Sequence, residues 1–209
     1  MLPTARDLTA LRRRDPVLGA AIRRLPAYPG FPLPATRRQT HWESLARAIV
    51  YQQLAGKAAA TIHGRVCALT PGRRFPRPEE LLALPTETLR GAGLSAAKTA
   101  SLRDLAARLT DVRLSLRAIG RLPDEAVVER LVEVRGIGVW SAQMFLMFRL
   151  GRLDVMPSGD LGVQEGLRLL DGLPERPRPR ALEARAGVWA PLRSVAAWTL
   201  WRLVDEARA

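Results

Sequence analysis

The sequence predicts an all-α protein. Three observations support this fold class: apolar residues recur at helical spacing along most of the 209 residues, helix-capping residues precede many of these stretches, and no segment alternates convincingly as a strand does. Proline and glycine mark loops at residues 28–34, 70–78 and 173–180, none of which is a long linker. We expect roughly ten short helices with short connections.

The first clear helix is expected from about His41 to Leu54, where Thr40 and Glu43 form a capping box. Ser95 and Asp124 are the expected N-caps of two later helices. The remaining helical patterns lie at residues 61–69, 78–84, 95–109, 123–134, 139–150, 160–170 and 193–207.

Composition narrows the class of partner. The formal net charge is +13, with a pI of about 11.5, which favours polyanions such as nucleic acid or an anionic membrane surface. Cys67 is the only cysteine, so an intrachain disulfide, a four-cysteine zinc site and a cysteine-ligated iron–sulfur cluster are excluded. No signal peptide or apolar run of about 18 residues is present, so we expect a cytoplasmic protein without a membrane span.

A glycine turn between two helical patterns is the most informative local feature. Gly136 and Gly138 permit positive φ and a close approach of a ligand to the backbone. Such a turn would present main-chain N–H groups at a helix N-terminus, where the helix dipole favours an anion such as phosphate. Taken alone, a Gly-x-Gly between two helices is more often an ordinary turn.

The turn does not stand alone, because it resembles the hairpin of the helix-hairpin-helix DNA glycosylases, the HhH-GPD superfamily. The matching positions are Leu131, Val134, Gly136, Ile137 and Gly138, followed by Asp160 at the expected distance. Residues 48–66, 93–106 and 189–202 are similar to stretches of the 3-methyladenine DNA glycosylase II branch. The first forty or so residues match no motif.

The resemblance implies two helical lobes with an active-site cleft between them. Residues 42–150 would form a helical barrel with the helix-hairpin-helix at 131–150, and residues 1–41 plus 151–209 would form the lobe that contains Asp160. It also implies a monofunctional glycosylase, without a cofactor, that flips alkylated bases of the 3-methyladenine and 7-methylguanine type out of duplex DNA. The enzyme would hydrolyse the N-glycosidic bond in base excision repair. Relatives that also nick the strand have a lysine where this chain has Trp140.

Asp160 is the catalytic residue that the resemblance implies. A carboxylate held in a low-dielectric site stabilises the oxocarbenium character of the deoxyribose and orients the attacking water. Asp160 also precedes a helical pattern and is expected to be its N-cap, and the two roles are compatible. Asp154, the rival carboxylate, resembles a structural aspartate.

By the same resemblance the base pocket is lined by Trp140, Trp201, Met144, Gln52 and Tyr51, and Gln53 is the wedge that fills the gap in the duplex. Aromatic faces suit alkylated bases because these bases are cationic. Met144 stands where a relative of broad substrate range has tyrosine, which suggests a wider or differently shaped pocket. We interpret the remaining tryptophans as packing residues; they are Trp42, Trp189 and Trp198.

The expected DNA-backbone contacts are Arg135, Gly136, Ile137 and Gly138, with Arg149 and Arg152 as further phosphate contacts. No catalytic metal is expected, and the resemblance allows a monovalent cation at the hairpin carbonyls of Val134 and Gly136. The expected partner is duplex DNA with damaged bases, bound by a monomer without a membrane or an obligate protein partner.

Three alternatives remain open from the sequence. They are a non-catalytic helix-hairpin-helix module that binds DNA or senses damage, a bifunctional glycosylase-lyase, and a helical protein–protein adaptor. The sequence also leaves the lesion range open.

Overall fold

The computed structural model describes residues 2–209. Within that range it contains twelve α-helices, joined by loops and single turns of 3-10 helix, and no β-strand. The prediction of an all-α fold is therefore confirmed.

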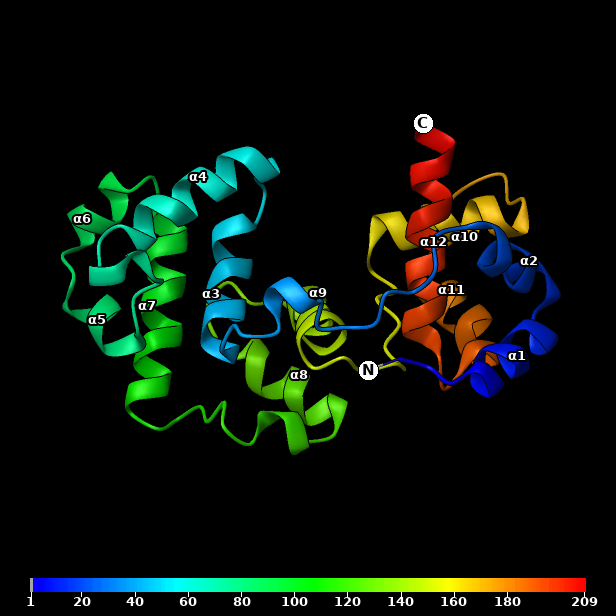
Figure 1. Cartoon of the computed structure of the whole chain (residues 1–209), viewed down its shortest axis with the longest axis horizontal. Coiled ribbons are helices and arrows are strands. Elements are labelled where there is room, and N and C mark those ends of the chain that lie inside the picture. The colour runs from blue at the N-terminus through cyan, green and yellow to red at the C-terminus, as the bar shows by residue number, and fades with distance from the viewer. Residues whose placement is uncertain (1) are drawn as a thin grey trace. The chain divides into compact units, whose positions relative to one another are not determined.

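The chain forms two compact units (Figure 1). The aspartate unit comprises Met1–Arg37 and Leu146–Ala209, and the hairpin unit comprises Arg38–Phe145. The sequence prediction set the corresponding boundaries at residues 42 and 150. The core of each unit is built from its own helices, so the two are described separately.

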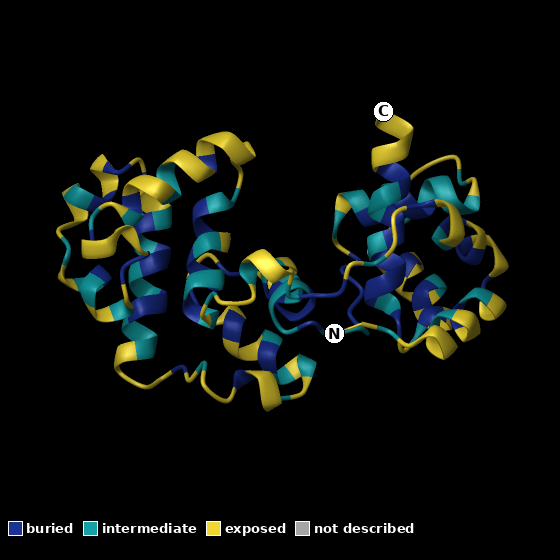
Figure 2. Cartoon of the chain, viewed as in Figure 1, coloured by how far each residue is buried: buried dark blue, intermediate teal, exposed yellow. Residues whose placement is uncertain are grey.

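In the aspartate unit, α12 is the central helix and packs against α10 and α2. α12 is largely buried through its middle and exposed at its C-terminal end (Figure 2). Gly166 permits the close crossing with α12, because a Cβ there would lie 2.4 Å from the carbonyl oxygen of Leu200. The helices of this unit are α1 (Ala5–Arg14), α2 (Pro16–Arg24), α10 (Leu161–Asp171), α11 (Pro179–Ala186) and α12 (Arg193–Arg208).

The buried carboxylate of Asp15 connects the start of α2 with α11 and with the turn that follows α11. Asp15 is 4% exposed and accepts a hydrogen bond from the indole of Trp189 at 2.7 Å. Arg185 pairs with the same carboxylate at 2.7 Å and with Asp171 at 2.8 Å. Buried charges are tolerated when paired in this way. The prediction that Trp189 is a packing residue is confirmed, since its side chain is fully buried.

In the hairpin unit, α7 is the central helix and packs against α3, α5 and α6. Its buried face includes Leu102, Leu105 and Ala106. The helices of this unit are α3 (His41–Tyr51), α4 (Gly56–Cys67), α5 (Pro78–Ala83), α6 (Thr86–Gly91), α7 (Ala96–Thr110), α8 (Asp124–Val132) and α9 (Val139–Met144).

In the hairpin unit the helix starts agree with the expected caps at two places and differ at one. Thr40 and Glu43 form the predicted capping box at α3, and Ser95 caps α7 through the N–H of Lys98. Asp124 is not an N-cap, because it is already the first residue of α8. There the carboxylate still lies in the first turn, where the helix dipole favours negative charge.

Two predicted helices are shorter in the structure. α3 ends at Tyr51 rather than Leu54, since the chain turns into positive φ at Gln53. The expected helix over 139–150 is α-helical only to Met144 and continues as one π-helical segment, Phe145–Arg149. A π-segment widens the helix locally and so changes which side chains face each side, something that a 3.6-residue pattern does not anticipate.

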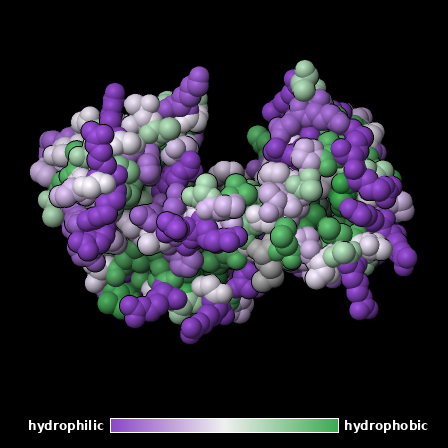
Figure 3. All heavy atoms as spheres, viewed as in Figure 1, coloured by the Kyte–Doolittle hydropathy of each residue, from purple (hydrophilic) through white to green (hydrophobic). Residues whose placement is uncertain are grey.

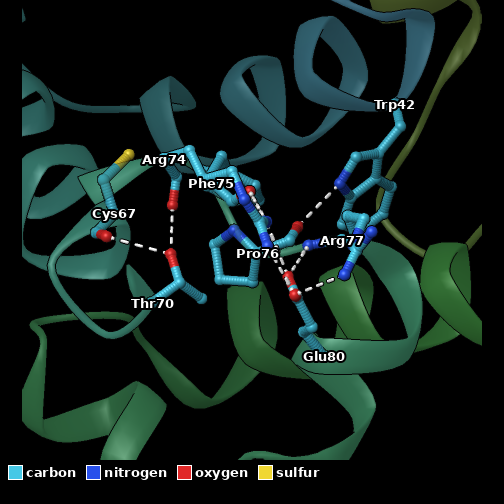
Figure 4. A network of polar contacts seen from close by, with 8 residues as sticks. All are labelled: Trp42, Cys67, Thr70, Arg74, Phe75, Pro76, Arg77 and Glu80. Carbon is cyan, nitrogen blue, oxygen red and sulfur yellow. Dashed lines mark hydrogen bonds and ion pairs between the residues drawn. The ribbon is translucent and has the colours of Figure 1, made fainter. Parts of the chain in front are cut away.

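The loop before α5 is held by a polar network (Figure 4). The indole of Trp42 donates to the carbonyl oxygen of Pro76 at 2.9 Å, and Arg74 donates to Glu80 at 2.6 Å. The hydrogen bond from Arg74, followed by that from the Arg77 backbone, lowers the pKa of Glu80 to about 2. Trp42 is thus a packing residue, as predicted, with its polar edge satisfied.

Hydrophilic residues cover much of the visible surface of each unit (Figure 3). None of the helices within residues 2–209 is long and apolar enough to cross a membrane.

Candidate active site and DNA-binding hairpin

The predicted glycine hairpin joins α8 to α9. Val134 and Ile137 point into the core, and the N–H of Ile137 donates to the carbonyl oxygen of Val134 at 3.0 Å. Gly136 adopts a φ of +78°, which glycine accepts without strain. Gly138 is the N-cap of α9 and is exposed, as Arg135 and Gly136 are. The hairpin therefore presents its glycines on the surface while its aliphatic residues anchor it.

Helix α7 packs directly against the hairpin and fixes its position. A Cβ on Gly136 would lie 2.4 Å from the hydroxyl of Ser101, so only glycine fits against this part of α7. One turn further along, the carboxylate of Asp104 accepts the backbone N–H of Arg135 at 2.8 Å. The Arg135 and Ile137 amides are thus used within the unit. Backbone binding of an anion is left to the later amides of the hairpin, at the start of α9.

The predicted wedge lies in the turn between α3 and α4. Gln53 is exposed and adopts a φ of +55°, unusual for a residue with a side chain. Its neighbour Gln52 donates from Nε2 to the carbonyl oxygen of Gly136 at 2.9 Å. Lys98 donates to the carbonyl oxygen of Val50 at 2.8 Å, at the end of α3, and burial lowers the pKa of this lysine. The wedge turn and the hairpin are therefore fastened to each other and to α7.

The hairpin carbonyls retain some capacity to bind a cation. The carbonyl oxygen of Val134 accepts the N–H of Ile137, and that of Gly136 accepts the side-chain amide of Gln52. A carbonyl oxygen has two lone pairs, and such oxygens are typical ligands of monovalent cations. The two groups thus fit a monovalent cation as part of its shell. Within residues 2–209 there is no group of three or more His, Cys, Asp and Glu side chains that is arranged to hold a metal ion.

The other residues of the hairpin unit that are predicted to line the base pocket lie on α9 and α3. Trp140 is 48% exposed in the first turn of α9, and Met144, four residues later on the same face, is half-buried. Tyr51 is half-buried, with the guanidinium of Arg47 3.8 Å from its ring centroid and His63 at its edge. A tryptophan that is this exposed contributes little to the core, which favours a role in binding.

In the aspartate unit, Asp160 is the N-cap of α10, as the sequence predicts. Its Oδ1 accepts the backbone N–H of Val163 at 2.8 Å and the indole N–H of Trp201 at 2.9 Å. The ring of Trp201 stacks on Phe148, with centroids 5.8 Å apart and planes at 30°. The structure thus brings Asp160 and Trp201 into direct contact.

The loop that leads to Asp160 is anchored at both ends. Ser194, at the start of α12, accepts the N–H of Val155 at 3.0 Å and donates to the carbonyl oxygen of Arg152 at 2.8 Å. Near the other end, Gln164 donates to the carbonyl oxygen of Ser158 at 2.9 Å. These bonds fasten the loop on both sides of the segment that leads to Asp160.

Asp154 pairs with the guanidinium of Arg193 at 2.7 and 2.8 Å. Burial alone would raise the pKa of Asp154, but the hydrogen bonds from Arg193 outweigh this effect and lower it. The prediction that Asp154 is structural agrees with this geometry.

Comparison with known families decides the class of protein. The model of the HhH-GPD superfamily of base excision DNA repair proteins matches residues 46–191, which include the wedge turn, the hairpin and Asp160. The chain belongs to the HhH-GPD superfamily. DNA-3-methyladenine glycosylase 1 of Schizosaccharomyces pombe is 38% identical over 162 residues, or 77% of this chain and 71% of the relative.

Solved HhH-GPD structures agree with this assignment. The 3-methyladenine DNA glycosylase of Schizosaccharomyces pombe in complex with abasic DNA superposes with a TM-score of 0.82 at 33% identity, over 94% of this chain and 95% of that one. A DNA-3-methyladenine glycosidase from Bacillus halodurans gives a TM-score of 0.85 at 33% identity, over 97% and 91% of the two chains.

Some features of this HhH-GPD chain were not predicted from its sequence. Phe148 supports Trp201 and packs against Phe31, which comes from the first forty residues. An aromatic residue in Tyr-Pro-Gly-Phe is a signal that could have been noticed, but its partner lies 117 positions away. Arg149, an expected phosphate contact, donates from Nη1 to the carbonyl oxygens of Thr36 and Arg37 at 3.3 and 3.4 Å. Its contact with phosphate stays a prediction.

Proposed function

We propose that the protein is a monofunctional DNA glycosylase of the 3-methyladenine glycosylase II type, which removes alkylated bases from duplex DNA in base excision repair. The observation that supports this most directly is Asp160, a carboxylate fixed by two hydrogen bonds at the start of α10 in a chain of this superfamily. The relatives named above are 3-methyladenine glycosylases, which favours alkylated bases as the substrate class.

Asp160 has a defined task in the proposed reaction. As the bond between C1′ and the base nitrogen breaks, the electron pair leaves with the base and the sugar acquires positive charge. The carboxylate stabilises that charge, and a water molecule adds through its oxygen to C1′ and loses a proton to Asp160 or to solvent. The products are the free base and an abasic site. A base methylated at N3 or N7 is already cationic, so it leaves without a proton donor.

Binding is assigned to the hairpin unit. The hairpin from Arg135 to Gly138 would hold a phosphate, and a monovalent cation bound at the Val134 and Gly136 carbonyls would add positive charge there. Gln53 would fill the gap left by the flipped base, since its turn is held to the hairpin through Gln52. The net charge of +13 predicts binding that weakens steeply with salt.

Recognition of the base is assigned to aromatic and polarisable side chains. Trp140 and Trp201 would attract a cationic base by their ring faces, at about 0.5 to 2 kcal/mol each. Met144 would give a wider pocket than tyrosine does, and Tyr51 and Gln52 would line it. The lesion range within this class is a matter for the experiment below.

The proposal includes the absence of lyase activity. Strand cleavage by these enzymes needs an amine close to the sugar, and the matching position is Trp140. The chain has two lysines, and one of them, Lys98, donates to the carbonyl oxygen of Val50. We further propose that the enzyme works as a monomer and without an obligate protein partner, because one lesion needs one active site. We also propose that it acts in the cytoplasm, as expected from the sequence.

The test is base release from methylated duplex DNA under single-turnover conditions, with a panel that includes 3-methyladenine, 7-methylguanine, ethenoadenine and hypoxanthine. We expect free methylated bases, strand breaks only after alkali, and no adduct trapped by borohydride. Binding without release of any base would favour the non-catalytic hairpin module. A trapped adduct with nicking would identify a lyase, and loss of DNA binding at moderate salt would favour the adaptor.

A further inference from the structure

Two elements hold the carboxylate of Asp160 through one oxygen. The N–H of Val163 reaches Oδ1 from α10 at 2.8 Å, and the indole N–H of Trp201 reaches the same atom from α12 at 2.9 Å. The first bond is an ordinary N-cap. The second is not required for capping, and it links the carboxylate to a different helix.

The indole of Trp201 is itself held in place. Its ring stacks on Phe148 at 5.8 Å, and Phe148 packs edge-on against Phe31 at 4.7 Å. An indole N–H is only a donor, so its direction is decided by the plane of the ring. With the plane fixed by Phe148, the N–H points at Asp160.

Gly162 makes the contact sterically feasible. A Cβ at this position would lie 2.9 Å from Cδ1 and 3.1 Å from Nε1 of Trp201, and 3.1 Å from Oδ1 of Asp160. Contacts under about 3 Å require the neighbour to move. Glycine inside a helix is otherwise unfavourable by roughly 1 kcal/mol relative to alanine. Its presence as the second residue of α10 is explained by the space that the indole needs.

We propose that Trp201 is a positioning residue for Asp160, and that Gly162 is required for it to act as one. This inference rests on the proposed function. With the N-cap bond alone, the carboxylate can still turn about its side-chain bonds while keeping one oxygen near Val163. The second donor, from α12, removes that freedom and keeps the charge in a single orientation during the reaction. Trp201 therefore contributes to catalysis through its N–H as well as through its ring.

Matched tryptophan variants separate the N–H from packing. Trp201→Phe keeps a ring against Phe148 and removes the donor. Trp198→Phe, one turn earlier on α12, removes an indole N–H that donates to a backbone carbonyl, that of Pro26, at 3.3 Å. For Trp201→Phe we expect the single-turnover rate of base release to fall about tenfold to hundredfold, the range for a lost hydrogen bond to a charged group, with the Kd for abasic duplex changed less than about threefold. Trp198→Phe should stay within about threefold of wild type.

Matched glycine variants test whether Gly162 is required for Trp201 to position Asp160. Gly162→Ala should lower the rate at least about tenfold, although alanine favours the helix. Gly187→Ala is the control, because its added Cβ meets no atom within 4 Å. Equal effects of Gly162→Ala and Gly187→Ala, or of the two tryptophan variants, would overturn the proposal in favour of simple packing.

An NMR measurement tests the hydrogen bond from the Trp201 indole to Asp160 independently of activity. The chain has five tryptophans, and the two phenylalanine variants assign the indole N–H resonances of Trp201 and Trp198. In Asp160→Asn we expect the Trp201 indole proton to shift and to exchange faster with solvent, and that of Trp198 to stay unchanged. An unmoved Trp201 resonance refutes the contact. If the wild type releases no base yet the resonance moves, the proposed function fails while the contact stands.

Discussion

Replacing Asp160 by asparagine and by alanine separates the structural role of this side chain from its chemistry. The Oδ1 atom accepts two hydrogen bonds, from Val163 and Trp201. An asparagine carbonyl oxygen can accept both, but it carries no charge. Alanine accepts neither. The asparagine variant should therefore keep its stability and lose its rate of base release. The alanine variant should lose stability as well as rate.

The magnitudes follow from these contacts. Asparagine and aspartate are equally good N-caps, so the free energy of unfolding of Asp160→Asn should lie within about 1 kcal/mol of wild type. Alanine loses the cap, at about 0.5 to 2 kcal/mol, and leaves the half-buried indole N–H of Trp201 without this acceptor, at about 1 to 3 kcal/mol. Loss of the charge should lower the rate about 10²- to 10⁴-fold in both variants.

Urea titration and single-turnover base release measure the two effects on the same preparations, and binding to abasic duplex provides the check that DNA is still held. An asparagine variant that keeps its rate within about fivefold of wild type would refute the catalytic role of Asp160. An alanine variant as stable as the asparagine variant would show that the two hydrogen bonds contribute little.

Three further outcomes are expected. Gly136→Ala should lower the free energy of unfolding by about 1 to 3 kcal/mol in urea titrations, because of its positive φ and the close approach of α7, while Gly138→Ala, whose Cβ meets no atom within 4 Å, should change it little. Gln52→Ala should raise the Kd for duplex DNA severalfold, since about 1 kcal/mol of hydrogen bonding to the hairpin is lost. Burial would raise the pKa of Asp15, but its hydrogen bonds, including one from Arg185, hold it below 3.8. Its contribution to stability is therefore present above pH 3.8 and is lost as the pH falls through the lowered pKa, which acid titration of unfolding would detect.

Each of these three predictions can be contradicted by a specific result. Equal stability of the two glycine variants would mean that the hairpin is not fitted against α7. A Gln52→Ala variant with unchanged Kd would mean that the wedge turn and the hairpin bind DNA independently. For the acid dependence assigned to Asp15, the control is Asp15→Asn, which should lose less stability in acid than wild type does. An identical loss would assign the effect to other carboxylates.

Local features of this fold could be predicted from the sequence because they depend on neighbouring residues. The capping box of Thr40 and Glu43 and the caps at Ser95 and Asp160 each involve residues three positions apart. The error at Asp124 is also local: Pro123 stands at the N-cap position, so the helix begins one residue earlier than expected.

Contacts between distant segments could not be predicted in this way. Gln52 and Gly136 are 84 positions apart, and Asp160 and Trp201 are 41 apart. Which atoms meet across such distances depends on how whole helices pack, and a pattern of apolar residues leaves that open. The change to a π-helix at Phe145 is a related case, because it alters the face on which Phe148 lies.

Two of the stretches that resemble a glycosylase, residues 93–106 and 189–202, overlap helices α7 and α12. Contacts made by these two helices explain why the stretches matter for the candidate site. In the hairpin unit, Lys98, Ser101 and Asp104 lie three residues apart on α7 and meet the end of α3, the hairpin glycine and the hairpin N–H in turn. In the aspartate unit, Ser194 and Trp201 lie two turns apart on α12 and meet the loop before Asp160 and Asp160 itself. A seven-residue separation returns to the same face of a helix. One face of α7 thus aligns the wedge turn with the hairpin, and one face of α12 aligns the loop before Asp160 with Asp160 itself.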